Sequence, residues 1–347
     1  MNIQTGILIA LIAGALNGIF ALPMKMNKNW AWENNWFPFS FLSLLIFPLF
    51  IVILSIPKPI ELLTSLPLHN IIIGLFCGII IYGGSLLFGI SIGYIGIALS
   101  FTLLVGSMSI VGVLLPLIIF NSNILISIGG IFLLSGVLLF LISLFFSFKA
   151  GKLKEASIKS QEIENTGEKS SMQKGMILAI TGGVLSGLLS LVMNMSWAKE
   201  IVDKAVQTGN ANLSYASNAV LFIIFIGGMM PNIGYCIFLL NKNKTWSLYK
   251  SNNSILYWIA ILAMGLVYSA STGLWGISIS ESMLGDLGPS VGWALFIGMM
   301  VISSNISGYL TGEWKSADKK TMRYLFISIG FIISALLLIG YGNYTLY

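Results

Sequence analysis

Charge is scarce in this sequence, and the few charged residues avoid the long apolar segments. Only 9% of the 347 residues are Asp, Glu, Lys or Arg, whereas 56% are hydrophobic. Soluble domains carry about 25% charged residues. This balance excludes a soluble globular domain and indicates a membrane protein with many spans. The net charge of +6 does not indicate a nucleic-acid partner, because the basic residues lie in loops between apolar runs.

Cysteine and histidine are also nearly missing, with two cysteines and one histidine in the whole chain. Cys77 and Cys236 fall inside apolar segments, and we expect free, buried thiols without a disulfide or a metal. No Gly-rich phosphate loop, metal-spaced His/Cys cluster or nucleophile–base pair is visible in the sequence. We therefore expect no cofactor, no metal ion and no enzymatic activity.

The twelve acidic residues all lie in loops or at the ends of apolar segments. A transporter of organic cations is expected to hold a carboxylate at membrane depth, so their absence there favours a neutral substrate. Ion coupling is then left without an obvious residue. Glu33, Glu281 and Asp286 lie nearest the apolar segments and are the candidates for it.

Ten apolar segments are long enough to cross the roughly 30 Å hydrocarbon core as helices. We expect an all-α membrane protein with spans at residues 5–24, 36–56, 70–92, 95–120, 124–147, 175–195, 214–240, 254–279, 287–311 and 322–341. The first segment has no charged region before it, so it is expected to be an uncleaved helix. Between spans five and six, residues 149–174 are rich in Lys and Glu and indicate a flexible linker.

The sequence repeats itself across this linker. Residues 175–194 align without gaps to residues 6–25, and a second pair aligns residues 94–106 with 287–298. The matched positions are Gly6/Gly175, Ala10/Ala179, Gly14/Gly183, Gly18/Gly187, Met24/Met193, Gly96/Gly288 and Gly106/Gly298. We expect two five-helix repeats, 1–148 and 175–347, joined by a cytoplasmic linker at 149–174. An odd number of spans makes such repeats inverted relative to each other.

Basic residues predict the orientation in the membrane. Fifteen of the 18 Lys and Arg lie in loops after odd-numbered spans, and three lie on the other side. Since basic loops stay cytoplasmic, both termini should be extracytoplasmic and the linker cytoplasmic. Trp30, Trp32, Trp36 and Trp314 fall on the inner side and are expected to be interfacial anchors.

Neutral polar and aromatic residues follow single faces of several spans. In the first span, Gly14, Asn17 and Gly18 share a face made of small side chains, which also suits close helix packing. Hydroxyls, amides and flat rings are the groups that a sugar needs for hydrogen bonding and stacking. We expect a substrate site formed by Asn17, Phe20, Tyr82, Thr102, Ser186, Ser190, Asn194, Ser271, Trp275 and Trp293.

The segment PMKMNKNWAWENNW, at residues 23–36, resembles the connection after the first helix in the bacterial L-rhamnose–proton symporter family of the drug/metabolite transporter superfamily. AGKLKE at 150–155, KGMILA at 174–179 and GEWK at 312–315 agree with that family too. The resemblance covers the whole chain. It implies a bacterial inner-membrane protein with ten helices in two inverted repeats, which takes up a sugar with protons. Lys25 and Glu33 match the family segment residue by residue.

Three functions remain open on the sequence. The first is a symporter of a neutral sugar, L-rhamnose or a similar monosaccharide, with protons by alternating access. The second is a related transporter of another small neutral solute or one coupled to Na⁺. The third is a channel-like facilitator or another non-transporter. For coupling, we expect Glu281 or Asp286 to carry the proton at the outer rim, where no basic residue is near in sequence, and Glu33 with Lys25 to act as a gate.

Overall fold

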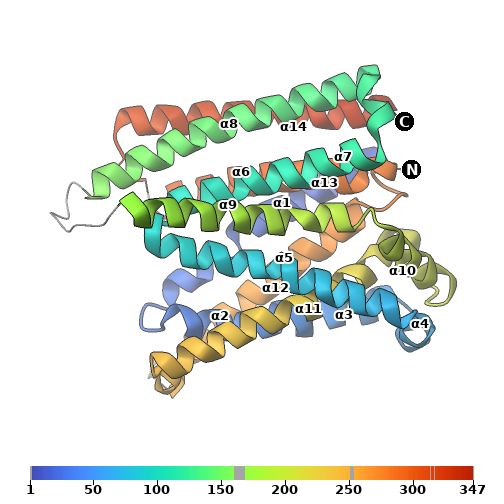
Figure 1. Ribbon diagram of the computed structural model, residues 1–347, viewed down its shortest axis with the longest axis horizontal. Helices are drawn as coiled ribbons and strands as arrows, with labels where there is room; N and C mark the ends of the chain where they lie inside the picture. Colours follow the sequence, from blue (N-terminus) through green and yellow to red (C-terminus); the bar gives the residue numbers. More distant parts are fainter. Residues whose placement is uncertain (1, 160–168, 251–253, 313, 316, 347) are drawn as a thin grey trace.

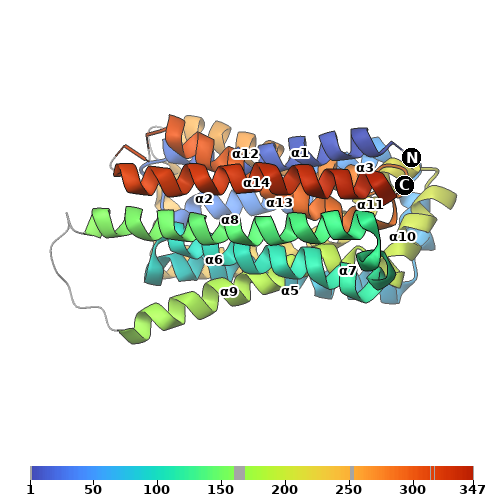
Figure 2. The same ribbon diagram turned by 90° about the horizontal axis from the view of Figure 1, so that it is seen from above.

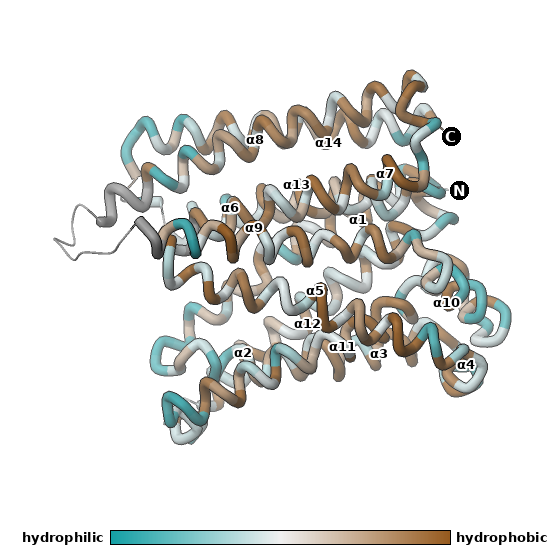
Figure 3. Tube along the Cα trace, in the orientation of Figure 1, coloured by the Kyte–Doolittle hydropathy of each residue, from teal (hydrophilic) through white to brown (hydrophobic). Residues whose placement is uncertain are grey.

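Long helices build the whole of the described structure. The computed structural model describes residues 2–159, 169–250, 254–312, 314–315 and 317–346. Within these ranges, ten helical segments are long and apolar enough to cross a membrane, as the sequence predicts. Apolar residues cover the middle of the bundle and hydrophilic ones gather at its two ends (Figure 3). A bilayer requires this distribution, because charged side chains are costly in hydrocarbon.

Short elements divide several spans and connect others. The first five spans are α1 (Ile3–Ile19) with η1 (Leu22–Met26), α2 (Trp32–Phe41) with η2 (Leu42–Ile46) and α3 (Phe47–Ser55), α5 (Leu68–Ile95), α6 (Ile97–Ser109) with η3 (Ile110–Leu114) and α7 (Leu115–Phe120), and α8 (Ile128–Lys159). The last five are α9 (Lys169–Val192), α11 (Leu213–Lys242), α12 (Ser254–Ser278), η6 (Gly285–Leu287) with α13 (Gly288–Leu310), and α14 (Lys319–Leu346). The connecting elements are α4 (Pro59–Ser65), η4 (Ser122–Ile126), α10 (Ser196–Gln207) and η5 (Thr245–Lys250).

Proline marks the irregular turns inside the spans. The π-helical turns η2 and η3 directly precede the turns that contain Pro48 and Pro116. Proline has no amide hydrogen to donate to the preceding turn, and a π-bulge accommodates the lost bond. Pro231 lies inside α11, whereas Pro289 lies in the first turn of α13, where its missing donor costs nothing.

The linker between the two halves is shorter than the sequence suggests. The sequence predicts a flexible segment at 149–174, but α8 continues to Lys159 and α9 begins at Lys169. Lys and Glu are good helix formers, so charge alone does not end these helices. Residues 160–168 lie outside the described residues.

The start of α1 and the end of α14 lie at one end of the bundle, and the end of α8 and the start of α9 lie at the other (Figure 1). We call these the terminal end and the linker end. Ten spans between the termini require that both termini are on the same side.

The helix pairing divides the bundle into a core and one peripheral pair. The helices α8 and α14 pack along each other at one edge (Figures 1 and 2). In the core, α1 packs against α12 and α13, and α9 packs against α5 and α6. The first helix of each half therefore contacts the third and fourth helices of the other half. The most deeply buried span is α13.

Glycines in α1 and α9 allow the backbones of these helices to contact the backbones of α13 and α6, respectively. A Cβ atom on any of four glycines would collide with a neighbouring carbonyl oxygen, so only glycine fits. The glycine–carbonyl pairs are Gly14–Phe296 and Gly18–Met300 between α1 and α13, and Gly183–Leu104 and Gly187–Met108 between α9 and α6. Each α1–α13 pair corresponds to an α9–α6 pair at the sequence offsets of the two repeat alignments. The two interfaces thus have the same register.

A short amphipathic helix that the sequence analysis missed covers the terminal end. In α10, Trp197, Ala198 and Ile201 are buried, whereas Lys199 and Asp203 point to solvent. The helix packs on α4, α5 and α11. A search for spans of about 20 residues overlooks a helix of 12 residues.

Candidate functional site

At the centre of the bundle, Asn17 joins the two halves. Its Nδ2 donates to Ser271 Oγ at 3.1 Å, and Ser271 Oγ donates to the Ala13 carbonyl at 2.8 Å. Asn17 is half-buried and Ser271 is fully buried. The small face of α1 brings α12 close enough for this chain of hydrogen bonds. Two of the residues predicted for the substrate site therefore lie in direct contact.

Two tyrosines meet beside this pair. The hydroxyls of Tyr82 on α5 and Tyr268 on α12 lie 3.0 Å apart. Around them is a box of aromatic rings, in which Phe20 lies 5.2 Å from Tyr268 and stacks on Phe39 at 5.4 Å between ring centroids. Phe225 packs edge-on against Tyr82. Hydroxyls framed by flat rings can hydrogen-bond and stack on a sugar.

The aromatic box contains residues that the predicted site lacked. Tyr268, Phe39, Trp36 and Asn232 are not among the binding residues that the sequence predicts. Trp36 packs on Phe39 and donates its indole Nε1 to Asn232 Oδ1 at 3.1 Å. Asn232 Nδ2 donates in turn to the Gly228 carbonyl. An amide inside the apolar seventh span was the available signal, because polar groups at membrane depth mark pathways.

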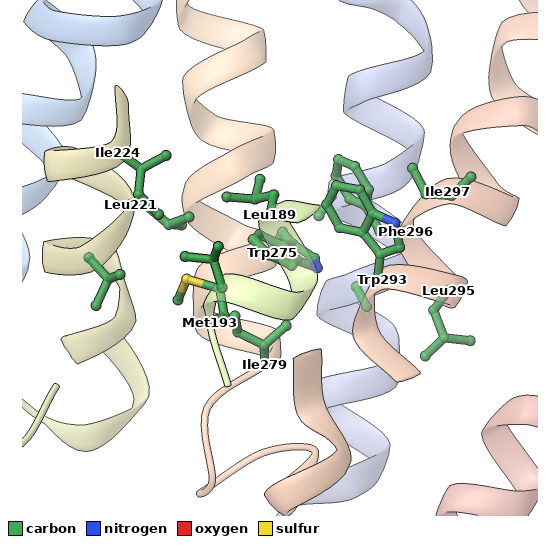
Figure 4. Close-up of a cluster of buried hydrophobic side chains, with 14 of the residues drawn as sticks. Leu189, Met193, Leu221, Ile224, Trp275, Ile279, Trp293, Leu295, Phe296 and Ile297 are labelled. Atoms are coloured by element: carbon green, nitrogen blue, oxygen red, sulfur yellow. The ribbon is translucent and has the colours of Figure 1, made fainter. Parts of the chain in front are cut away.

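A cluster of buried apolar side chains, which we call the apolar plug, includes Leu189, Met193, Trp275, Ile279 and Trp293 (Figure 4). Its centre is Trp275 packed edge-to-face on Trp293, with ring centroids 5.1 Å apart. Trp275 is 1% exposed and Trp293 4%. Trp293 lies over Gly112 and donates its Nε1 to the Met108 carbonyl at 3.3 Å. These two predicted residues therefore pack on each other inside the apolar plug.

A small polar cavity of about 70 Å³ lies on the outer side of this plug. Asn194, Glu281 and Asp286 line it, so three predicted residues come together here. Lys199 and Asp203 of α10 line the same cavity. Small-molecule pockets measure about 300–1,000 Å³, so the cavity in this state is too small for a sugar. No basic residue is near the two carboxylates in sequence, but Lys199 of α10 lines the same cavity in the folded protein.

Three further predicted residues take different positions. Ser186 packs against α5, where a Cβ on Gly84 would lie 2.8 Å from its Oγ. Ser190 is fully buried and donates to the Pro289 carbonyl at 2.9 Å, so it ties α9 to α13. Thr102 is half-buried on α6. The predicted site is therefore spread along the bundle. Its central group includes Asn17, Ser271 and Tyr82, and its terminal group includes Asn194, Trp275 and Trp293.

Glu33 and Lys25, the two residues predicted for the gate, each contact another element at the linker end. Glu33 is 3% exposed and accepts hydrogen bonds from Asn243 Nδ2 at 2.9 Å and Thr245 Oγ1 at 3.0 Å. Lys25 donates to Thr311 Oγ1 at 2.9 Å. Glu33 thus joins the start of α2 to the end of α11, whereas Lys25 joins η1 to the end of α13.

Trp30 is a core residue and not the interfacial anchor that the sequence predicts. It is 6% exposed, donates its Nε1 to the Leu248 carbonyl at 2.9 Å, and packs on Tyr249, Tyr257 and Trp258. Burial raises the pKa of the Tyr249 phenol, so this ring stays neutral at physiological pH. The segment after the first span therefore docks into the hairpin between α11 and α12.

The central group of Asn17, Ser271, Tyr82 and Tyr268 consists of neutral side chains. Its contacts join amides, hydroxyls, carbonyls and rings. Among the described residues, no three His, Cys, Asp or Glu side chains are placed to hold a metal ion. A larger depression of about 600 Å³ lies at the start of α14, lined by residues such as Lys319, Arg323 and Phe326, and none of the predicted site residues lines it.

Comparison with known proteins identifies the family. A family model described as "L-rhamnose-proton symport protein (RhaT)" matches residues 1–345. Proteins named L-rhamnose-proton symporter from Escherichia coli O9:H4 (strain HS) and from Citrobacter koseri are each 30% identical to this chain, over 98% of both chains. One crystal structure superposes with a TM-score of 0.61 at 13% identity, covering 97% of this chain and 96% of the other, and is similar in fold. The chain therefore belongs to the L-rhamnose-proton symport protein (RhaT) family.

Proposed function

We propose that this protein takes up L-rhamnose, or a similar neutral monosaccharide, together with protons. The observation that carries the proposal is the family match over residues 1–345. The neutral centre of the bundle supports it independently. A site without charge suits a substrate without charge, because an unpaired buried charge is costly.

We place the sugar at the central group, between Asn17, Ser271, Tyr82 and Tyr268. These residues come from α1, α5 and α12, so both halves of the chain contribute. Phe20 supplies a flat ring next to the hydroxyls. Ser186 and Thr102 lie on α9 and α6, the other helices of the core, and complete the proposed lining when the bundle opens.

The two halves, 1–148 and 175–347, act in this proposal as inverted repeats joined by the segment 149–174. The equal register of the α1–α13 and α9–α6 contacts supports this division. So does the side-chain pairing at the third helices. Ser271 contacts Ala13 and Asn17, and Gly84 packs on the matching Gly182 and Ser186. Repeats of this kind support alternating access by exchanging their conformations.

The terminal end faces the outside of the cell in this proposal. The excess of Lys and Arg in loops at the linker end supports that orientation. A reporter that is active only in the cytoplasm should be silent when fused after Tyr347 and active when inserted near Glu164. The opposite pattern would reverse the orientation and every inside–outside assignment that follows from it.

Glu281 and Asp286 are the proposed proton carriers, and Glu33 with Lys25 the proposed gate at the cytoplasmic side. Both carboxylates line the outer cavity with Asn194, so a proton entering from outside meets them first. Glu33 and Lys25 each join an early loop to a helix of the second half. Closing the linker end therefore has to rearrange their contacts.

Uptake into proteoliposomes tests the function directly. Labelled L-rhamnose should accumulate when a proton gradient is imposed, and unlabelled L-rhamnose should compete better than other monosaccharides. Accumulation that follows a Na⁺ gradient would favour the related Na⁺-coupled transporter. Flux that neither saturates nor shows counterflow would favour a channel-like facilitator.

A further inference from the structure

Two aromatic pairs occupy equivalent positions at opposite ends of the bundle. Trp275 on α12 packs edge-on against Trp293 on α13 near the terminal end. Phe88 on α5 packs edge-on against Phe101 on α6 near the linker end. The offset that matches Gly84 to Ser271 matches Phe88 to Trp275, and the offset that matches Leu104 to Phe296 matches Phe101 to Trp293.

The two pairs differ in how tightly they are packed. The tryptophan rings lie 5.1 Å apart and are buried, in a cluster that includes Leu189 and Met193 of α9 (Figure 4). The phenylalanine rings lie 6.3 Å apart and are half-buried. Phe20, the counterpart of Leu189, stacks on Phe39. One end of the bundle is therefore sealed, and the equivalent pair at the other end is loose.

A single hydrogen bond accounts for much of this asymmetry. Trp293 Nε1 donates to the Met108 carbonyl, and Trp293 reaches it because Gly112 has no side chain in the way. The counterparts at the linker end are Phe101, which has no donor, the Met300 carbonyl, and Ser304, which carries a side chain where Gly112 has none. The linker end thus lacks both the donor and the space.

We propose that Trp275–Trp293 and Phe88–Phe101 are the two gates of the transport path, and that the Trp293–Met108 hydrogen bond biases the substrate-free protein toward the state closed at the terminal end. This assignment rests on the proposed function. When the terminal gate opens, the linker gate closes by packing Phe88 and Phe101 as Trp275 and Trp293 are packed now. Phe88 and Phe101 thereby become functional residues that neither the sequence nor the family match assigns.

Two pairs of cysteines at equivalent positions report on the two gates. Met193 and Ile279 line the same cavity beside the tryptophan plug, and Met24 and Ile92 are their counterparts at the linker end. The full-length protein is reconstituted with Cys77→Ala and Cys236→Ala, and carries either Met193→Cys/Ile279→Cys or Met24→Cys/Ile92→Cys. A short bismaleimide is the probe. In the absence of sugar, the first pair should cross-link and the second should cross-link little.

Two gate variants should shift the ratio of the two cross-linking yields in the same direction, one by removing a hydrogen-bond donor and the other by adding one. Trp293→Phe removes the donor at the terminal gate, and Phe101→Trp/Ser304→Gly builds the missing donor and its space at the linker gate. Each should lower the yield of the first cross-link and raise that of the second, changing their ratio by roughly two- to tenfold, since one hydrogen bond is gained or lost. A misfolded protein would lose both cross-links together, so only a reciprocal change supports the proposal.

The proposal is overturned if neither variant produces reciprocal changes, or if the Met24→Cys/Ile92→Cys pair already cross-links fully in the parent protein. The cross-links are measured without sugar and without a proton gradient. Failure of rhamnose uptake in the parent protein would therefore overturn the proposed function while leaving the gates to be decided by the cross-links.

Discussion

At the scale of one residue, Asn17 packs against Ser271 and is also a proposed ligand of the sugar. Its Nδ2 holds Ser271, but Ser271 has a bond of its own to the Ala13 carbonyl. Removing the Asn17 amide therefore leaves Ser271 satisfied, and the fold loses little. A half-buried amide that the fold does not need is suited to meeting a substrate hydroxyl.

Asn17→Ala should weaken sugar affinity by about 2- to 10-fold, equivalent to about 0.5–1.5 kcal/mol for one lost hydrogen bond. The thermal midpoint in detergent should change little. Equilibrium binding of labelled L-rhamnose to the purified variant measures the first quantity, and a melting curve measures the second.

Ser147→Ala is the matched control for this variant. Ser147 Oγ lies 2.6 Å from Ser328 Oγ between α8 and α14, in the peripheral pair away from the central group. Its loss should lower the melting temperature slightly and leave affinity unchanged. If Asn17→Ala instead melts early with normal affinity in the surviving protein, Asn17 is a packing residue.

At the scale of elements, α1 and α9 pack through positions where glycine provides no side chain. Glycines on one face of each helix bring it into backbone contact with the fourth helix of the other half. Such contacts replace the hydrophobic driving force, which is absent between helices in lipid. Any side chain at these positions forces the helices apart.

Gly14→Ala and Gly183→Ala should each destabilise the protein by about 1–3 kcal/mol through overpacking. The added methyl groups meet the carbonyl groups of Phe296 and Leu104, respectively. Gly83→Ala is the control, because a Cβ there meets nothing within 4 Å, and alanine raises helix propensity. Chemical denaturation in detergent should separate the first two variants from the third; equal loss in all three would reject close packing as the cause.

The sequence predicts the spans well because hydropathy over about 20 residues reports the bilayer directly. It also predicts the faces of α1 and α9, since glycine spacing follows the helix period. The sequence does not predict contacts between segments that are far apart along the chain. The helix α10 is too short to register as a span, and only the folded structure places its Lys199 in the cavity that Glu281 and Asp286 line. Trp30 resembles an interfacial anchor until η5 and α12 cover it.

The predicted site includes residues at two depths of the bundle, because depth also depends on contacts between helices. Asn17 and Ser271 meet at the centre, whereas Trp275 lies one helical turn beyond Ser271 on the same face of α12, inside the apolar plug. A helical face fixes the direction of its side chains and leaves their depth open. Depth is set by the register between helices, which the glycine contacts determine.

At the scale of the whole molecule, polarity is arranged in layers along the bundle. Neutral hydrogen-bonding groups lie at the centre, an apolar plug lies on one side of them, and charged residues lie beyond it in the outer cavity. In the proposed orientation, a proton from outside would meet Glu281 and Asp286 first, and the proposed sugar site lies deeper in the bundle. Coupling then requires that the state of the carboxylates controls the opening of the plug between them and the sugar.

Glu281→Gln/Asp286→Asn should abolish proton-driven accumulation of sugar and spare counterflow exchange. Exchange carries a sugar each way and needs no net movement of protons, whereas accumulation does. Glu33→Gln should impair both modes, because its carboxylate holds α2 against α11 through Asn243 and Thr245. Both assays use the same proteoliposomes, with and without an imposed pH gradient.

Glu61→Gln is the control for a carboxylate outside the outer cavity. Glu61 pairs with Lys58 at 3.0 Å in an exposed turn, so its neutralisation should leave both modes intact. Lys199→Met removes a cation from the lining of the cavity that Glu281 and Asp286 also line. If these carboxylates carry the proton, Lys199→Met should alter the pH dependence of accumulation and leave exchange unchanged. Normal accumulation in the double variant would exclude both carboxylates as carriers, and would direct the search for the coupling group to Glu33 or to another ion.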